Sequence, residues 1–344
     1  LSPSGQAATA NPLKMIYYGE PCRIRKYCIG GSAESFYSGA IMSDDLPFER
    51  HFDPPVGVPE EVAPGVRRMV APNSSPFTFR GTNTYIVGTG SVAIIDPGPD
   101  SEAHRAAIEK AVEGQTVTAV VVTHTHRDHS PLAPAIARAH GAKTYGFGPH
   151  RPARPPYPDE DLRLDASNDT DFAPDVALAD GGRVEGDGWT LIAVHTPGHT
   201  SNHICLELEG TGTLFCGDHV MAWSTTIVAP PDGNMADFMA SLEKLATRGD
   251  MLYLPGHGGA LREPSRFVRL LALHRRQREA SILKRLQAGE HTVPEIVSKI
   301  YKGLDPNLTT AAGLSVLAHI EDLMDRGLVV ANGEPGFATE FRPA

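Results

Sequence analysis

The chain has 344 residues, of which 41% are hydrophobic and 21% are charged, so it is long enough for two domains with a substantial apolar core. The formal net charge of −10 argues against an electrostatic nucleic-acid binder, although the residues from Ala260 onward carry +2 and those before it −12. Four cysteines are too few for a disulfide scaffold, and we find neither a run of about 18 apolar residues nor a secretory signal. We therefore expect a cytoplasmic protein without a membrane segment.

The first part of the chain differs in composition from the rest. Residues 1–41 are rich in Gly, Ser and Tyr without a clear period, and the sequence from Met42 resembles a natural start. We expect an irregular extension over 1–41 and leave open whether it belongs to the natural protein. A catalytic domain is predicted over 42–260 and a smaller domain over 261–344.

The region after residue 64 alternates predicted strands and helices in chain order. We expect strands at 65–72, 83–88 and 91–99, a helix at 101–114, a strand at 117–123, a helix at 130–141 and a strand at 142–147. A Pro- and Asp-rich stretch without period at 148–175 predicts a long loop, of the kind that forms lids or binding loops. Further strands are expected at 189–196, 203–209, 212–218 and 251–258, with a helix at 235–249.

The last part of the chain is mainly helical. We expect helices at 263–289, 292–301 and 308–327, and then two short strands around a Gly- and Pro-containing turn at 328–341. Three helices and a hairpin of this size resemble a winged helix. Between Leu261 and Leu286 the chain has eight basic and two acidic residues, which predicts either a phosphate-binding face or a solvated amphipathic helix.

The sequence "THTHRDH" follows a buried run of valines and holds His124, His126, Asp128 and His129. In α/β folds the carboxyl end of such a strand opens onto the crevice where sites form. His124 and His126 lie two residues apart, so both can point at one position, whereas Asp128 and His129 can point at a neighbouring one. Imidazole nitrogens and carboxylate oxygens are ligands that zinc takes, so the motif predicts a metal site rather than an exposed His-rich loop.

Three more short motifs each follow a predicted strand and contain Gly: "TPGHT" with His199, "CGDH" with Asp218 and "LPGHG" with His257. Loops at strand ends can converge on one rim of a sheet, so the motifs predict two ligand sets. The first set is His124, His126 and His199, and the second is Asp128, His129 and His257. Asp218, which has two carboxylate oxygens, can bridge them.

These four motifs, in this order, resemble the metallo-β-lactamase superfamily, and the resemblance covers residues from about Gly65 to Gly259. It implies an α/β fold, a four-layer αββα sandwich with a two-metal site on one edge, and every ligand position matches. The turn "DPGP" also fits the family, and Asp96 in it resembles a residue that supports ligands without binding metal. A bridging Asp218 resembles the hydrolases of the superfamily, such as glyoxalase II and the ribonucleases, more than true β-lactamases.

The trailing winged helix, together with "VRRMVAPN", "FRGTNTYIVG" and "PPDG", resembles the β-lactamase-like protein 2 branch, which includes endoribonucleases acting on single-stranded RNA. We expect a metal-dependent hydrolase that uses a hydroxide bridging two zinc ions, with iron or manganese as alternative metals. Asp128 is the predicted catalytic residue, which orients the hydroxide and takes its proton. A phosphodiesterase or endoribonuclease is expected first, and the alternative is a small-molecule ester, thioester (glyoxalase II-like) or lactam hydrolase.

Other residues near the motifs are candidates for contacts with the ligands or the substrate. His203 and His219 depart from the family pattern and put the choice of substrate in doubt. Ser224, Thr225 and Thr226 either line the pocket or are ordinary polar loop residues. A non-catalytic binding protein is a third class, which the complete ligand set disfavours. The substrate, the native metal, a homo-oligomeric state and the role of the winged helix stay open.

Overall fold

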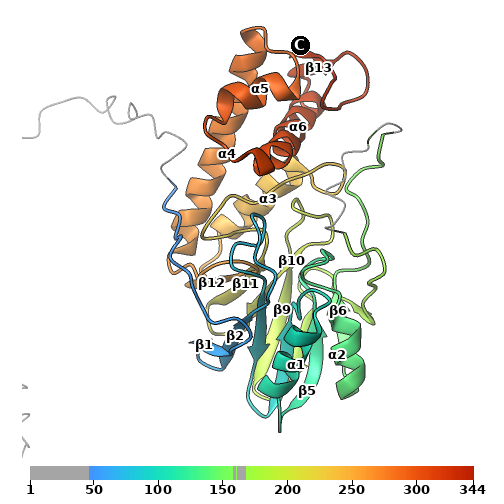
Figure 1. The fold of residues 1–344 in the computed structure, drawn as a ribbon, viewed down its shortest axis with the longest axis vertical. Helices are drawn as coiled ribbons and strands as arrows, with labels where there is room; N and C mark the ends of the chain where they lie inside the picture. The colour runs from blue at the N-terminus through green and yellow to red at the C-terminus, as the bar shows by residue number, and fades with distance from the viewer. Residues whose placement is uncertain (1–45, 158–159, 161–167) are drawn as a thin grey trace, which may run out of the picture. The chain divides into compact units, whose positions relative to one another are not determined.

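The computed structural model describes residues 46–157, 160 and 168–344 (Figure 1). The predicted extension over 1–41 lies outside the described residues, as does part of the predicted loop over 148–175. In the described part of the chain, no helix has both the length and the apolar character needed to cross a membrane.

A seven-stranded sheet forms the first half of the sandwich. Its strands lie side by side in chain order: β1 (Glu60–Ala63), β2 (Val66–Val70), β3 (Asn83–Val87), β4 (Ser91–Ile95), β5 (Thr116–Val121), β6 (Lys143–Gly146) and β7 (Val176–Ala177). Strands β1 to β4 are antiparallel neighbours, whereas β4 to β7 run parallel to one another. The carboxyl ends of β4 and β5 therefore open at the same edge of the sheet.

A five-stranded sheet forms the second half, in the order β12-β11-β10-β9-β8. Its strands are β8 (Arg183–Gly186), β9 (Trp189–His195), β10 (Ile204–Leu208), β11 (Thr213–Gly217) and β12 (Leu252–Pro255). Neighbours from β8 to β11 are antiparallel, and β11 and β12 are parallel. The ends of β11 and β12 therefore also share one edge.

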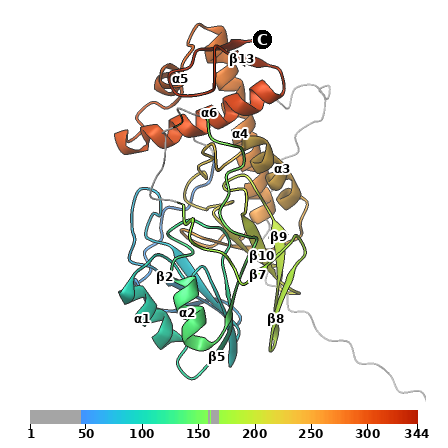
Figure 2. The same cartoon turned by 90° about the vertical axis from the view of Figure 1, so that its right-hand side faces the viewer.

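Three apolar cores hold the layers together. Both sheets contribute to the middle core, which includes Val121 of β5 and Leu206 of β10. Val120 points to the opposite face of β5, where α1 (Glu102–Ala111) and α2 (Ala133–His140) cover the first sheet. The helices α3 (Met235–Ala246) and α4 (Pro264–Gln287) cover the second sheet on its outer face. Figure 2 shows helices outside both sheets, which confirms the predicted αββα sandwich.

The C-terminal part packs around a core of its own. It consists of α5 (Val293–Ile300), a 3-10 turn (Pro306–Leu308), α6 (Thr309–Asp325) and a hairpin of β13 (Val329–Ala331) and β14 (Phe341–Pro343), which is the predicted winged helix. Thr292 and Glu295 form a capping box at the start of α5. Ile296, Leu317 and Phe341 are buried together.

The long helix α4 belongs to two cores at once. Phe267 and Leu271 in its first half pack with α3 in the core behind the second sheet, whereas Ile282 and Leu286 in its second half lie in the winged-helix core. The described residues form one compact unit. The domain boundary between residues 260 and 261 therefore stays a prediction.

Two details differ from the sequence-based expectation. The strands β1, β7 and β8 are absent from it, because β1 and β8 carry few apolar residues and β7 has only two residues. Helix α2 begins at Ala133 rather than at Ser130. The reason is a turn before it, in which the backbone amides of His129 and Ser130 donate to the His126 carbonyl at 2.9 and 3.1 Å.

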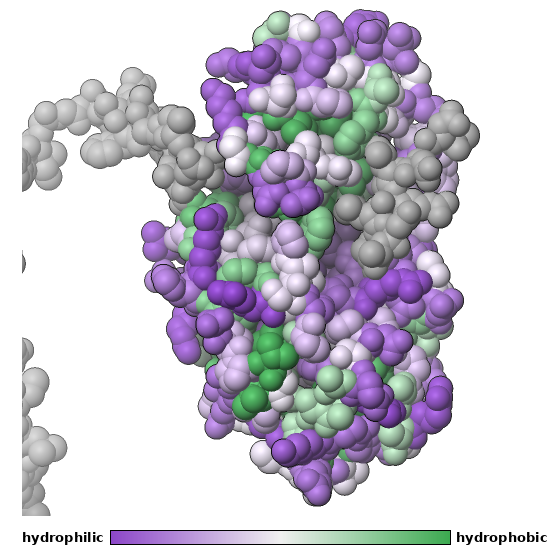
Figure 3. Space-filling model, viewed as in Figure 1, coloured by the Kyte–Doolittle hydropathy of each residue, from purple (hydrophilic) through white to green (hydrophobic). Residues whose placement is uncertain are grey.

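The large apolar side chains that are exposed in the described part of the chain are spread over several segments, and only Val56 and Val58 are close in sequence. They are Val56, Val58, Phe77, Met251, Leu273 and Leu328. The face drawn in Figure 3 shows apolar residues in small groups between polar ones. Scattered exposure of this kind is normal for globular proteins.

Candidate metal centre

Loops that follow five strands bring the predicted ligands and Asp96 to one edge of the sandwich. The stretch His124–His129 follows β5, and Asp96 follows its parallel neighbour β4. His199 comes after β9, Asp218 after β11, and His257 after β12. The carboxyl ends of neighbouring parallel strands meet at one edge, which explains why residues so distant in the sequence come together.

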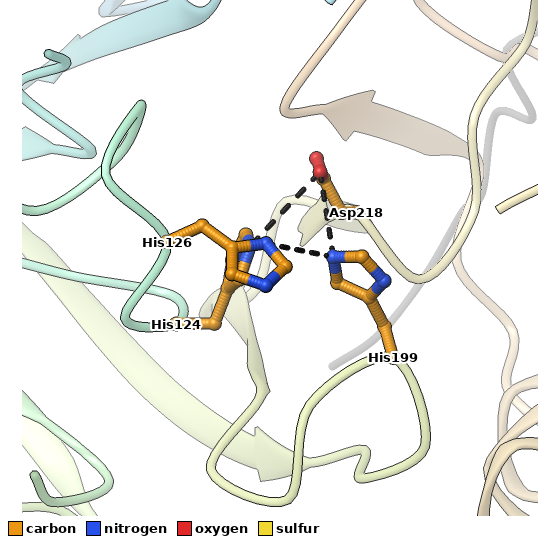
Figure 4. Close-up of side chains that lie close together, drawn as sticks. All are labelled: His124, His126, His199 and Asp218. Atoms are coloured by element: carbon orange, nitrogen blue, oxygen red, sulfur yellow. Dashed lines mark hydrogen bonds and ion pairs between the residues drawn. The ribbon is translucent and has the colours of Figure 1, made fainter. Parts of the chain in front are cut away.

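One group of donor atoms comes from His124, His126, His199 and Asp218 (Figure 4). The Nδ1 atom of His126 lies 2.9 Å from His124 Nε2 and 3.1 Å from His199 Nε2. The Oδ2 atom of Asp218 lies 3.9 and 3.7 Å from the same two Nε2 atoms. Three imidazole nitrogens and one carboxylate oxygen therefore face one position, a donor set that suits zinc.

A second group lies beside the first and comes from Asp128, His129 and His257. The Nε2 atom of His257 lies 3.2 Å from Asp128 Oδ2 and 3.3 Å from Asp218 Oδ2. The Nε2 atom of His129 lies 3.5 Å from Asp128 Oδ2 and 3.6 Å from Asp218 Oδ1. The carboxylate of Asp218 is thus close to donor atoms of both groups.

Two buried atoms of this cluster point to a metal. His129 Nε2 and Asp218 Oδ1 have no hydrogen-bond partner among the described residues. Buried polar atoms are normally paired, because an unpaired one loses its hydration without compensation. Coordination to a metal ion would satisfy both atoms, so the residues present fit metal ions.

Four of the five histidines use their other ring nitrogen to contact the surrounding protein. Their Nδ1 atoms donate as follows: His124 to Thr123 Oγ1 at 3.0 Å, His129 to Asp96 Oδ2 at 2.9 Å, His199 to the Ile227 carbonyl at 2.7 Å and His257 to the Gly81 carbonyl at 3.2 Å. A ring that donates through Nδ1 turns Nε2 toward the cluster, where its lone pair can bind a metal ion once Nε2 carries no proton.

Asp96 lies behind the cluster and links Thr123 to His129, at the two ends of the His-rich stretch after β5. Its Oδ1 atom accepts the backbone N–H of Thr123 at 2.8 Å, and its Oδ2 atom accepts the Thr123 hydroxyl at 2.8 Å and His129 Nδ1 at 2.9 Å. The side chain of Asp96 therefore holds the end of β5 and the ring of His129 in a fixed relation.

The backbone of Asp218 is held from two sides. His203 Nε2 accepts the backbone N–H of Asp218 at 3.2 Å, while its Nδ1 donates to Thr196 Oγ1 at 2.9 Å. The Thr226 hydroxyl donates to the Asp218 carbonyl at 2.6 Å. Gly217 has a φ of 47°, and a Cβ atom there would lie 2.5 Å from His203 Nε2, so only glycine fits at this position.

The two donor groups differ in their electrostatics. Burial lowers the pKa of His124 and His199 and brings the pKa of His126 to about 3, so these three rings are neutral and offer lone pairs. Burial also lowers the pKa of His257, but the neighbouring carboxylates outweigh it and raise the pKa to about 10. Without a metal ion the His257 ring is therefore protonated at neutral pH, and a cation bound between the same carboxylates would take the place of this proton.

The remaining candidate residues lie in different environments. Thr226 is 1% exposed, and its hydroxyl contacts the carbonyls of Asp218 and His219. Ser224 and Thr225 are half-buried, and the Ser224 hydroxyl contacts the Thr225 carbonyl at 3.4 Å. His219 is buried beside Asp218, with its ring centroid 4.4 Å from that of Phe238.

Several supporting residues are absent from the sequence-based prediction. The carbonyls of Gly81 and Ile227 orient two of the histidines, and a backbone carbonyl has no side-chain signature in the sequence. The Thr82 hydroxyl donates to Asp128 Oδ2 at 3.1 Å. Its position in "RGTN", between two predicted strands, is the one signal that could have indicated it.

Comparison with known protein families decides the classification. Residues 77–257, more than half of the chain, match the model of the metallo-beta-lactamase superfamily. The chain belongs to this superfamily. Residues 292–337 match the beta-lactamase associated winged helix domain. The protein is therefore a hydrolase with the metallo-beta-lactamase fold, and it has two His/Asp groups that can hold metal ions.

Relatives of this metallo-beta-lactamase protein carry different names. An atrochrysone carboxyl ACP thioesterase of Aspergillus terreus is 29% identical over 290 residues, which cover 77% of this chain and 82% of the relative. A beta-lactamase-like protein 2 homolog of Drosophila melanogaster is 31% identical over 286 residues, which cover 76% of this chain and 88% of the relative.

Solved structures of the superfamily have the same fold. A beta-lactamase domain protein from Burkholderia ambifaria is 26% identical with a TM-score of 0.71, and the match covers 88% of this chain and 99% of that one. A metallo-beta-lactamase family protein from Thermus thermophilus is 24% identical with a TM-score of 0.66, and the match covers 83% of this chain and 100% of that one.

Proposed function

We propose that this enzyme hydrolyses a thioester or ester of a small organic acid, with a metal ion in each donor group. The observation that supports two metals is the Asp218 carboxylate, whose Oδ1 faces His129 and whose Oδ2 lies between His257 on one side and His124 and His199 on the other. The thioesterase name of the Aspergillus terreus relative supports the substrate class. The charge of −12 before Ala260 also disfavours a polyanion, although the sequence alone placed an RNA substrate first.

Each predicted ligand has a place in this proposal. The first ion would be held by His124, His126, His199 and Asp218, and the second by Asp128, His129, His257 and Asp218. Zinc ions would supply Lewis acidity toward a carbonyl oxygen and make water more acidic near neutral pH. Iron and manganese also accept such donor sets, so elemental analysis of the purified protein tests the choice of zinc.

Asp128 is the proposed catalytic residue. Its side chain is 24% exposed, compared with 9% for Asp218, so it faces the open side of the cluster. The Thr82 hydroxyl and the His257 ring hold its Oδ2 atom from inside. The Asp128 carboxylate would accept the proton of the attacking water and pass it to the leaving thiolate or alkoxide.

A substrate panel tests the proposal. We expect the zinc-loaded protein to hydrolyse a chromogenic thioester or ester, and Asp128→Asn to lower kcat by at least about 100-fold through loss of the proton acceptor. Asp100→Asn is a matched control, because Asp100 is exposed. Inactivity of the fully loaded wild type on thioesters, esters and lactams alike would contradict the proposed substrate class.

Single-stranded RNA is the second candidate substrate, as predicted from the branch resemblance. It is favoured by one side of α4, where Arg266, Arg269, Arg276 and Lys284 are exposed, and by the exposed Arg262 just before this helix. Two of these are partly neutralised, since Arg266 contacts Glu263 at 3.2 Å and Arg276 contacts Glu243 at 2.8 Å. Cleavage of labelled single-stranded RNA with added zinc or manganese, weakened by salt and by Arg269→Glu, would favour this candidate over the thioester.

A further inference from the structure

A buried arginine lies where α4 passes behind the candidate metal centre. Arg275 is 3% exposed, whereas its neighbour Arg276 has a side chain that is 57% exposed. Arg275 donates a hydrogen bond from Nη2 to the backbone carbonyl of Thr226. Burial lowers the pKa of Arg275 to about 10, so the guanidinium remains charged at neutral pH.

The segment that Arg275 contacts is the one that orients two predicted ligands. The Thr226 hydroxyl donates to the Asp218 carbonyl at 2.6 Å and also lies 3.2 Å from the His219 carbonyl. The next carbonyl, that of Ile227, accepts His199 Nδ1 at 2.7 Å. Two consecutive residues thus connect the backbone of Asp218 and the ring of His199.

A second contact runs in parallel through an aromatic ring. The Arg275 guanidinium lies 5.2 Å from the centroid of the Phe238 ring, and the His219 ring lies 4.4 Å from the same centroid. Gly198 packs against the backbone of Phe238 so closely that a Cβ atom there would lie 2.3 Å from Phe238 Cα. Arg275 therefore contacts the surroundings of Asp218 and His199 by two routes.

We propose that Arg275 is a positioning residue of the metal centre, which holds Asp218 and His199 in place through Thr226 and Ile227. Its charged hydrogen bond fixes a carbonyl in a segment that has no regular secondary structure. Because α4 also forms part of the winged-helix core, the same contact connects that core to the ligands. The inference rests on the metal centre of the proposed function.

Metal affinity of the full-length protein tests the proposal without any substrate. The zinc affinity of Arg275→Met and of the control Arg276→Met is measured by competition with a chromophoric chelator. Both variants are also loaded with cobalt, and the visible absorption of the bound cobalt is recorded. We expect Arg275→Met to bind zinc about 10- to 100-fold more weakly than wild type with an altered cobalt spectrum, as found when contacts to metal ligands are removed. Arg275→Lys should recover part of the affinity, and Arg276→Met should resemble wild type.

A purely structural role has a different outcome. Folded Arg275→Met that melts at lower temperature without metal, yet binds zinc within about twofold of wild type, would overturn the proposal. If Arg275→Met does not fold, Thr226→Val is tested instead, because valine has a similar volume but lacks the hydroxyl that holds Asp218. An unchanged zinc affinity of Thr226→Val would again overturn the proposal. A wild type that binds no metal at all would instead refute the proposed function itself.

Discussion

Asp96 adopts a left-handed backbone conformation, with a φ of 48°, that is uncommon for residues other than glycine. Such strain persists only where the surrounding structure compensates it, and it concentrates at functional sites. At Asp96 the compensation comes from three hydrogen bonds to the carboxylate, two from Thr123 and one from His129. Asp96 thereby fixes the ring of His129, a predicted ligand that lies in a different loop.

Replacing Asp96 with asparagine tests this role. Asparagine tolerates the same backbone conformation but offers only one acceptor atom, so at least one of the three hydrogen bonds is lost. We expect Asp96→Asn to remain folded and to bind zinc about 10- to 100-fold more weakly, as measured by chelator competition. An affinity equal to that of an Asp100→Asn control would show that Asp96 does not orient His129.

Helix α1 is attached to this turn by a buried histidine. His104 is 1% exposed, and its Nε2 lies 2.9 Å from the Thr84 hydroxyl, which itself donates to the Asp96 carbonyl at 2.7 Å. Burial lowers the pKa of His104 to about 4, because the charged ring would lose its hydration inside the protein. The docking of α1 therefore requires neutral His104.

A pH series of unfolding measurements tests this dependence. The unfolded histidine has a pKa of about 6.5, above the folded value of about 4, so as pH falls the unfolded chain takes up the proton first. Stability from neutral His104 is present above about pH 6.5 and decreases toward about pH 4. We expect metal-free wild type to lose about 3 kcal/mol more than His104→Gln over this range in urea unfolding. Parallel curves for the two proteins would contradict the buried neutral state.

Strands and helices with strong patterns were predictable from the sequence. So were the side chains that gather at the candidate metal centre, but the backbone carbonyls that orient them were not. The valine run of β5 and the histidines after it identify both the strand and the ligand candidates. The position of Arg275 was not predictable, because in the sequence it is one of eight basic residues in a stretch that reads as solvated. Its burial depends on the carbonyl of Thr226, 49 residues earlier, and only the folded chain brings the two together.

The loop after β6 is tied to the winged helix by a cluster of charges. Arg154 donates to Glu160 at 2.7 Å and to Glu321 of α6 at 3.1 and 2.5 Å, and all three side chains are largely buried. The amides of Ala153 and Arg154 donate to the Pro231 carbonyl at 2.8 and 3.3 Å. The winged helix thus helps to hold a loop that borders the metal-binding edge.

Removing the arginine leaves two carboxylates in a confined space. We expect Arg154→Met to lower the free energy of unfolding by about 3 kcal/mol, because breaking a buried pair leaves its partners uncompensated. Glu321→Gln in that background should restore part of the loss. Hydrogen exchange at the Ala153 and Arg154 amides should accelerate in Arg154→Met and stay unchanged in Arg151→Met, since Arg151 is exposed. Equal exchange in all three proteins would contradict this role for the winged helix.

The sharing of α4 between two cores has a consequence for synthesis on the ribosome. Domains usually fold from the N-terminus as they emerge, each completing its core before the next is made. Here the core behind the second sheet needs Phe267, Leu271 and Ala272, which are translated after every predicted metal ligand. We therefore expect the nascent sandwich to stay incomplete, with apolar surface exposed, until α4 has left the exit tunnel.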